Sequence, residues 1–235
     1  MQYRTWFATS DELLKSIKFL TNYWNNRFKM CYIVFISSKL TVMPRQKEFE
    51  KEEVLEKAMN TFWRFGFEGT SMQSLVKNMG INRSSLYETF GDKRSLFEAA
   101  ITHYEKTRMQ GMVDFLQEMG ASKPAITKVF YNLIDQSISD EERRGCFLTN
   151  TAIELCPHNP QMAKRIATDM KIVEKAFYKV LLKAQAKGEI APHKDLSQIA
   201  QYLTSSFQGI RVMAKINQEP EFLRNIVKVT LSVLD

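Results

Sequence analysis

The sequence predicts an all-α protein, and three observations lead to this fold class. Only 9 of the 235 residues are glycine and 6 are proline, which leaves little turn chemistry for strands joined by hairpins. Apolar residues recur three and four positions apart through most of the chain after residue 47, which is the spacing of one helix face. With 44% hydrophobic and 25% charged residues, the composition is globular and excludes collagen-like and disordered classes.

Residues 1–42 differ from the rest of the chain, and they are expected to be an N-terminal extension. They mix aromatic and basic residues with Ser and Asn, and they are interpreted as a tail or as an artefact of a start codon placed too early. An added helix packed on the body is the alternative, because Trp6 and Trp24 are costly to leave in water. This segment holds six Lys/Arg against two Asp/Glu, so the net charge of +7 does not by itself identify a nucleic-acid-binding domain.

Residues 43–91 are expected to fold as a unit of three helices. The apolar residues of segment 49–62 lie on one face of a first helix, which ends at Gly66. A Thr-x-x-Gln capping pattern at residues 70–73 begins a short second helix, which stops at Gly80.

The third helix of this unit begins at the cap residue Asn82 and ends at Gly91. Two short helices joined by a short glycine-containing turn, with a longer helix in front, describe a helix-turn-helix. The outer face of the third helix carries small polar groups, one guanidinium, one phenol and one carboxylate, which belong to Arg83, Ser84, Ser85, Tyr87, Glu88 and Thr89. Such groups reach base edges and phosphates in a major groove.

The segment from Arg64 to Phe97, RFGFEGTSMQSLVKNMGINRSSLYETFGDKRSLF, resembles the DNA-binding signature of TetR-family transcriptional regulators. The positions that match are Gly66-Phe67, Thr70-Ser71, Leu75, Gly80-Ile81, Leu86-Tyr87, Phe90 and Lys93. The resemblance implies a DNA-binding domain over residues 43–91 and a ligand-binding and dimerisation domain over residues 92–235. It also implies a repressor that a small molecule releases from a palindromic operator.

The resemblance assigns DNA contacts to residues of three kinds. Groups at the start of the second helix would hold phosphate, side chains of the third helix would enter the major groove, and a phenol and a lysine would clamp the flanking backbone. The phosphate-binding residues are Thr70 and Ser71, the major-groove residues are Arg83, Ser84 and Ser85, and the residues that clamp the backbone are Tyr87 and Lys93. Glu88 is the exception, because a carboxylate near phosphate is repulsive unless it accepts from a cytosine N4.

Helical spacing continues beyond Asp92. Six further helices are expected near residues 96–116, 124–134, 147–155, 160–188, 195–213 and 220–234, with a break in the first of them near Gly111. One helix-turn-helix covers only one half-site, so a homodimer is expected. The resemblance places its interface on the last two helices, where Tyr202, Phe207 and Val227 are candidates; the alternative is that these residues complete the core of one chain.

A small-molecule pocket is expected among the fourth to eighth helices, where helical bundles place ligands. The candidate residues are Met and aromatic side chains with one polar anchor, namely Tyr104, Met112, Phe130, Phe147, Asn150 and Phe177. Aromatic residues at helical spacing also form ordinary core, which is the alternative. The effector itself is not identified by the sequence.

No pattern indicates an enzyme, a cofactor or a metal site. The three histidines are far apart without HExxH, and neither a glycine-rich phosphate loop nor GxSxG occurs. The three cysteines lack metal-ligand spacing, and no apolar run approaches the roughly 18 residues of a membrane span. A cytoplasmic protein with reduced thiols is therefore expected.

Two other functions remain open. Cys146 follows Arg143 and Arg144, and nearby cations lower the pKa of a thiol, so a redox or electrophile sensor is one alternative, with a buried inert cysteine as the plain interpretation. The other alternative is a helical small-molecule-binding module that does not bind DNA. A protein of this second kind would form no saturable, specific complex with DNA.

Overall fold

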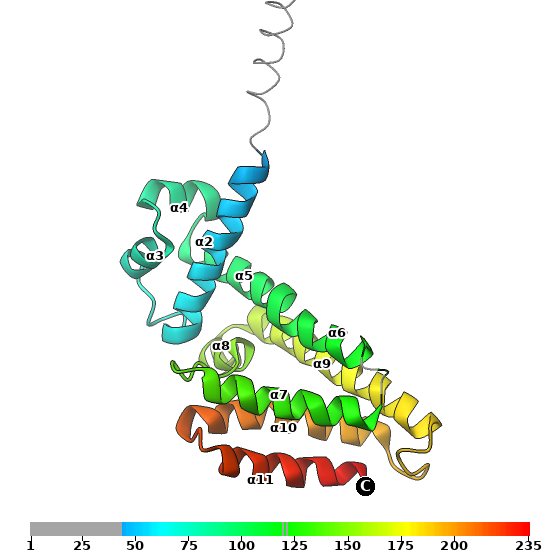
Figure 1. Ribbon diagram of the computed structural model, residues 1–235. Helices are drawn as coiled ribbons and strands as arrows, with labels where there is room; N and C mark the ends of the chain where they lie inside the picture. The colour runs from blue at the N-terminus through cyan, green and yellow to red at the C-terminus, as the bar shows by residue number, and fades with distance from the viewer. Residues whose placement is uncertain (1–43, 119, 121) are drawn as a thin grey trace, which may run out of the picture. The chain divides into compact units, whose positions relative to one another are not determined.

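The computed structural model describes residues 44–118, 120 and 122–235 (Figure 1). The expectations for residues 1–42 and for Cys31 lie outside these residues. Contacts along the chain divide it into two units between Lys51 and Glu52, and the following description concerns the second unit. Every regular element among the described residues is helical, which confirms the all-α prediction.

The first three helices are α2 (Pro44–Phe65), α3 (Met72–Met79) and α4 (Arg83–Phe90). They end at glycines with positive φ, as the sequence predicts: Gly66, Gly80 and Gly91. Their contacts are made by fully buried residues from all three helices, including Phe62, Leu75 and Leu86. We call residues 52–91 the helix-turn-helix unit.

The predicted cap of α3 is one residue off. Ser71, not Thr70, is the N-cap: its hydroxyl oxygen accepts from the Ser74 N–H at 3.0 Å, and the Ser71 N–H donates to the Ser74 hydroxyl at 3.1 Å. Thr70 is buried, and its hydroxyl donates to the carbonyl of Gly66 at 2.6 Å. The Thr-x-x-Gln pattern therefore fails because Thr70 closes the turn after α2, while a Ser-x-x-Ser pair forms the capping box.

The remaining helices follow the predicted order. They are α5 (Lys93–Tyr104), α6 (Gln110–Glu118), α7 (Lys123–Ser139), α8 (Phe147–Leu155), α9 (Pro160–Ala186), α10 (Leu196–Ile216) and α11 (Pro220–Leu231), with short 3₁₀ turns at Cys156–His158 and Ser232–Leu234. The predicted caps are confirmed: Asn159 accepts from the Met162 N–H, and Asp195 accepts from the N–H groups of Ser197 and Gln198.

The break expected near Gly111 does not fall at this glycine. The helical run changes instead at a π-helical turn, η1 (Glu105–Met109), and Gly111 lies inside the regular helix α6. A helical glycine costs only about 1 kcal/mol, so it need not interrupt a helix. Glu105, the first residue of η1, accepts two hydrogen bonds from the guanidinium of Arg165 in α9, at 3.0 and 2.9 Å. This contact holds η1 against α9.

Two aromatic clusters organise the core. Phe130, Phe177 and Phe207 join α7, α9 and α10, with ring centroids 5.5–6.0 Å apart. A second cluster joins α2, α5 and α8 and consists of Phe62, Trp63, Phe97, Tyr104 and Phe147. In Figure 1, α7, α10 and α11 follow one another as layers, and α11 contacts both of the other helices. Within the described ranges, no helix is long and apolar enough to cross a bilayer.

Candidate functional site

The outer face of α4 is open to solvent. Leu86 is its only fully buried side chain, whereas Arg83, Ser84, Glu88 and Thr89 are exposed. The Asn82 side-chain oxygen caps the helix by accepting from the Ser85 N–H at 2.8 Å and from the Ser84 hydroxyl at 2.8 Å. The cap fixes the end of the helix that presents the predicted base-reading residues.

Arg83 and Tyr87 form a pair on this face. They lie four residues apart, the Arg83 guanidinium carbon is 5.7 Å from the centre of the Tyr87 ring, and Nη2 donates to the phenol oxygen at 3.5 Å. Tyr87 is 43% exposed, so both groups are available to a partner. Ser85 is half-buried beside them.

Of three further predicted DNA contacts, Ser71 is exposed, Lys93 is half-buried and Thr70 does not reach the surface. Ser71 is exposed at the start of α3, and the Lys93 ammonium sits 4.4 Å from the centre of the Phe67 ring. Thr70 is only 1% exposed and its hydroxyl is used by Gly66, so this side chain does not present a phosphate ligand. The spacing of apolar residues in the sequence does not show that the Thr70 side chain points inward.

Glu154 makes a long-range contact with the loop between α2 and α3, and no sequence pattern predicts this contact. Its carboxylate, on α8, accepts from the backbone N–H of Phe67 at 2.9 Å and of Glu68 at 2.7 Å, in the loop between α2 and α3. Gly66 gives this carboxylate its room, because a Cβ there would lie 2.8 Å from a Glu154 oxygen. The two partners are 86 or more residues apart, so only the folded chain brings them together.

The loop before α8 also contacts the helix-turn-helix unit. Arg144 donates to the Asn60 side chain at 2.8 Å, and its guanidinium carbon lies 4.4 Å from the centre of the Trp63 ring. Arg64 forms an exposed ion pair with Glu142 at 2.6 Å. Together with Glu154, these contacts connect the C-terminal helices to α2 and to the loop that follows it.

A cavity of about 550 Å³ lies among α5, η1, α6, α7 and α10. Tyr104 and Met112 line it, as predicted. The other four candidates do not: Phe130, Phe147 and Phe177 are fully buried core residues, and Asn150 bonds to the Arg144 carbonyl and to Lys215. Phe130 and Phe177 pack on each other, and Phe147 packs on Phe97 and Tyr104. Helical spacing marks the buried face of a helix without saying whether that face meets a cavity.

The charge of the cavity wall was missed by the sequence reasoning. Five basic side chains line the cavity, namely Arg108, Arg143, Arg144, Arg211 and Lys215, and Asp140 is the single acidic residue among its lining residues. The basic residues come from η1, from the loop before α8 and from α10, so no local run of charge predicts the cluster.

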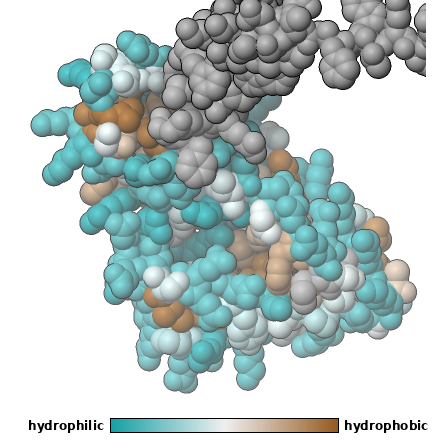
Figure 2. Space-filling view, turned by 45° about the horizontal axis from the view of Figure 1, so that its top comes forward, coloured by the Kyte–Doolittle hydropathy of each residue, from teal (hydrophilic) through white to brown (hydrophobic). Residues whose placement is uncertain are grey.

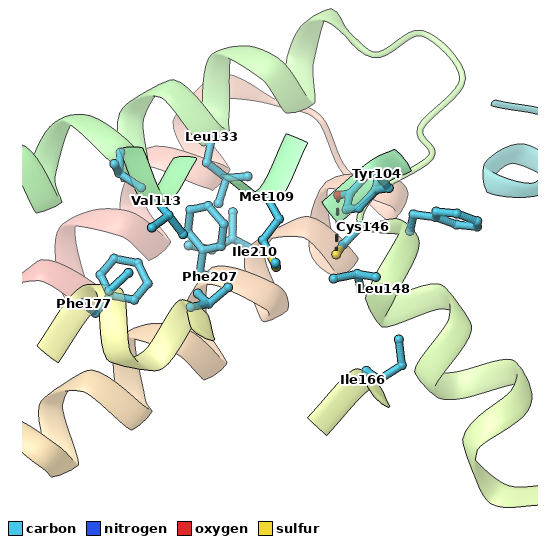
Figure 3. Packing of buried hydrophobic residues seen from close by; sticks show 14 of the residues in the cluster. Tyr104, Met109, Val113, Leu133, Cys146, Leu148, Ile166, Phe177, Phe207 and Ile210 are labelled. Carbon is cyan, nitrogen blue, oxygen red and sulfur yellow. Dashed lines mark hydrogen bonds between the residues drawn. The ribbon is translucent and has the colours of Figure 1, made fainter. Parts of the chain in front are cut away.

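Cys146 is buried at the start of α8, facing Tyr104 at the end of α5 (Figure 3). The Tyr104 hydroxyl donates to Sγ at 3.8 Å, and Arg211 donates to the Tyr104 oxygen at 3.1 Å. Burial raises the pKa of the Cys146 thiol, but the charge of Arg211 and hydrogen bonds from Thr149 outweigh burial, so the pKa lies below its usual value. Burial raises the pKa of Tyr104.

The pKa of the Cys146 thiol is lowered, as a nearby cation would lower it, but the cation is not one of its neighbours in the sequence. The cation is Arg211 of α10, not the neighbouring Arg143 or Arg144. Within the described part of the chain, no group of three or more His, Cys, Asp or Glu could hold a metal ion.

A shallow apolar groove runs along α10 and α11. It includes Tyr202, Met213, Phe222, Ile226 and Val229, of which Tyr202 is 42% and Val229 67% exposed. Phe207 and Val227, the other two interface candidates, are buried within the chain, so for them the alternative of a core role holds.

Figure 2 shows hydrophobic residues gathered in separate patches on a largely hydrophilic face of the described residues.

Comparison with known proteins identifies the family. The family described as "Bacterial regulatory proteins, tetR family" matches residues 54–100, and the family described as "Tetracyclin repressor-like, C-terminal domain" matches residues 122–230. The HTH-type transcriptional regulator YezE of Bacillus subtilis strain 168 is 37% identical over 194 residues, which are 82% of this chain and 100% of that protein.

Other relatives agree. The HTH-type transcriptional repressor ComR of Escherichia coli K12 is 29% identical over 80% of this chain and 90% of its own length. A cysteine mutant of the TetR-family regulator CifR, solved with 26-base-pair operator DNA, superimposes with a TM-score of 0.71 at 25% identity, over 78% of this chain and 95% of that one. The chain therefore belongs to the TetR family of bacterial transcriptional regulators.

Proposed function

We propose that this protein is a repressor that binds a palindromic operator as a homodimer and leaves it when a small molecule occupies the cavity. Family membership makes the chain a DNA-binding regulator rather than an enzyme. The observation that carries the proposal is the exposed polar face of α4, which Asn82 caps and Leu86 anchors. Its relative ComR is a repressor, and CifR has been solved on operator DNA.

The proposed DNA contacts are predicted side chains of the helix-turn-helix unit, and Lys93 at the start of α5, that are exposed or half-buried. Arg83, Ser84 and Ser85 read base edges, because a guanidinium pairs with the O6 and N7 of guanine and hydroxyls contact either bases or phosphates. Tyr87 and Lys93 hold the flanking backbone. The N–H groups at the start of α3, next to Ser71, favour a phosphate through the helix dipole.

The proposed dimer uses the groove of α10 and α11. Exposed residues such as Val229 leave apolar surface in water, which a second copy would cover. A two-fold axis pairs the same patch of both chains, and it sets two α4 helices about one duplex turn apart.

The proposed effector acts through the loop before α8. Arg144 lines the cavity and at the same time bonds to Asn60 of α2. A ligand that engages Arg144 competes with this bond, and it favours the conformation in which the bond is broken. The positions of the two α4 helices then no longer match successive major grooves.

The experiment starts with DNA selected from a random library by the full chain. Fluorescence anisotropy then compares the wild type with Arg83→Ala and with Lys179→Ala, whose exposed side chain on α9 has no partner among the described residues. We expect Arg83→Ala to weaken specific binding about 5- to 150-fold, the equivalent of about 1–3 kcal/mol, and Lys179→Ala to change it less than twofold. A selection that yields no saturable complex refutes the proposal and favours the binding module without DNA contact.

Cys146 supports a second candidate, a thiol-based sensor. Its thiol has a lowered pKa and lies beside Tyr104 and Arg211, which both line the cavity. An electrophile with an activated carbon–carbon double bond that enters the cavity would form a carbon–sulfur bond with the thiolate as its π bond opens, and the resulting carbanion takes a proton from water. N-ethylmaleimide is expected to release DNA from the wild type and not from Cys146→Ser; equal release from both proteins contradicts this candidate.

A further inference from the structure

We propose that the cavity binds an organic anion, a carboxylate attached to an apolar body. The inference rests on the proposed function in that this ligand is the effector, but its binding is measurable without DNA. It is carried by three basic lining side chains that lack a carboxylate partner among the described residues, together with apolar side chains that line the same cavity.

The basic residues of the cavity fall into two groups. Arg108 is paired with Glu56 at 2.7 Å and Arg144 with Asp140 at 3.0 Å. Arg143, Arg211 and Lys215 form no ion pair with any acidic residue that the structure describes. The cavity wall therefore carries more basic than acidic side chains, and an anion would neutralise this excess.

Arg211 is the most informative of these residues, because it is half-buried on α10. It donates to the neutral Tyr104 hydroxyl at 3.1 Å and also interacts with the Cys146 thiol, and its guanidinium carbon lies 4.8 Å from the centre of the Phe207 ring. A guanidinium removed from water without a carboxylate is costly, and it has five N–H donors to satisfy. A carboxylate accepts two of them side by side.

Two other hydrogen-bond donors at the cavity, on Lys215 and Trp63, also lack an anionic acceptor among the described residues. The Lys215 ammonium reaches only neutral oxygens, the Arg144 carbonyl and the Asn150 side chain, both at 3.3 Å. Trp63 has a buried indole N–H without an acceptor among the described residues. A ligand rich in acceptor oxygen fits this arrangement, whereas a cationic ligand would be repelled.

The rest of the wall sets the shape of the ligand. Met112, Phe115, Val129, Leu133 and Phe207 line the same cavity. These apolar side chains gain nothing from inorganic phosphate or sulfate, but they bury a hydrocarbon body favourably. The volume of about 550 Å³ lies in the range of small-molecule sites.

The first test uses matched probes. Aliphatic and aryl carboxylates of about four to twelve carbons, which this cavity volume accommodates, are compared with their own amides and amines by thermal shift and by isothermal titration calorimetry of the full chain. We expect one carboxylate or more to bind at one molecule per chain, at least tenfold more tightly than its amide, with no binding of the amine. A panel in which no carboxylate binds more tightly than its amide overturns the inference.

The second test locates the anion. Arg211→Gln keeps a donor for Tyr104 and removes the charge, and it is expected to weaken the best carboxylate about 10- to 100-fold. Lys215→Gln is expected to weaken it at least threefold, and Lys179→Gln on the outer surface of α9 less than twofold. Because Lys215 is exposed, its variant is expected to fold even if Arg211→Gln does not. If both soluble variants bind the carboxylate as the wild type does, the inference fails.

DNA binding separates this inference from the proposed function. If the selected DNA is bound and no carboxylate binds, the anion inference fails while the repressor stands. If the carboxylate binds in a manner that depends on Arg211 but the chain forms no specific DNA complex, the cavity assignment stands and the repressor fails.

Discussion

Glu154 is expected to hold the helix-turn-helix unit against the C-terminal helices, and Glu154→Gln tests this. The carboxylate accepts two backbone N–H groups, from Phe67 and Glu68. A hydrogen bond to a charged group contributes about 1.5–3 kcal/mol. The lower end applies here because Glu68 is exposed and Phe67 is half-buried. An amide retains one acceptor oxygen and turns an NH₂ group towards the other N–H, so we expect a loss of about 2 kcal/mol in the free energy of unfolding.

Thermal unfolding followed by circular dichroism measures this loss. For 150–250 residues, 1 kcal/mol corresponds to about 2–4 °C, so the Tm of Glu154→Gln should fall by about 4–8 °C. Glu141→Gln is the control, since its exposed side chain has no hydrogen bond to any residue that the structure describes. If Glu154→Gln melts within about 1 °C of the wild type, the two hydrogen bonds do not stabilise the folded chain as argued.

Three further predictions concern other parts of the molecule. Lys93→Gln should reduce the slope of log K against log salt by about 1 for the selected DNA; an unchanged slope places Lys93 off the phosphate backbone. Burial and the neighbouring Glu105 raise the pKa of Asp169 to about 7, so the folded state keeps a proton that the unfolded state loses, and stability falls as pH rises from about 4 to about 7. Asp169→Asn should therefore raise the Tm at pH 8 and flatten this part of the pH profile; a lower Tm at pH 8 contradicts the assignment. Val229→Asp should shift a dimer towards monomer in light scattering without lowering the monomer's own stability, because this side chain is 67% exposed; a dimer of unchanged stability places the interface elsewhere.

The sequence by itself determined most of the helices and most of their ends, although not the cap of α3 or the π-helical turn η1. Apolar spacing, the cap residues Asn82, Asn159 and Asp195, and the glycines after the helices act over one or two turns, so they can be recognised locally. The same local signals determined the exposed face of α4, because a helix that buries Leu86 must turn the residues around Arg83 outward. The family resemblance rested on this segment.

Only the tertiary structure decided which buried residues face a cavity and which charges share it. Phe130 and Phe177 have the same helical spacing as Met112, yet they pack on Phe207 in the core. Spacing defines the inward face of a helix, but what that face meets depends on helices far away in the sequence. Arg211 lowers the pKa of Cys146, which is 65 residues away in the sequence, and Glu154 accepts a hydrogen bond from Phe67, which is 87 residues away. Contacts at such separations depend on how the helices pack and not on a local sequence pattern.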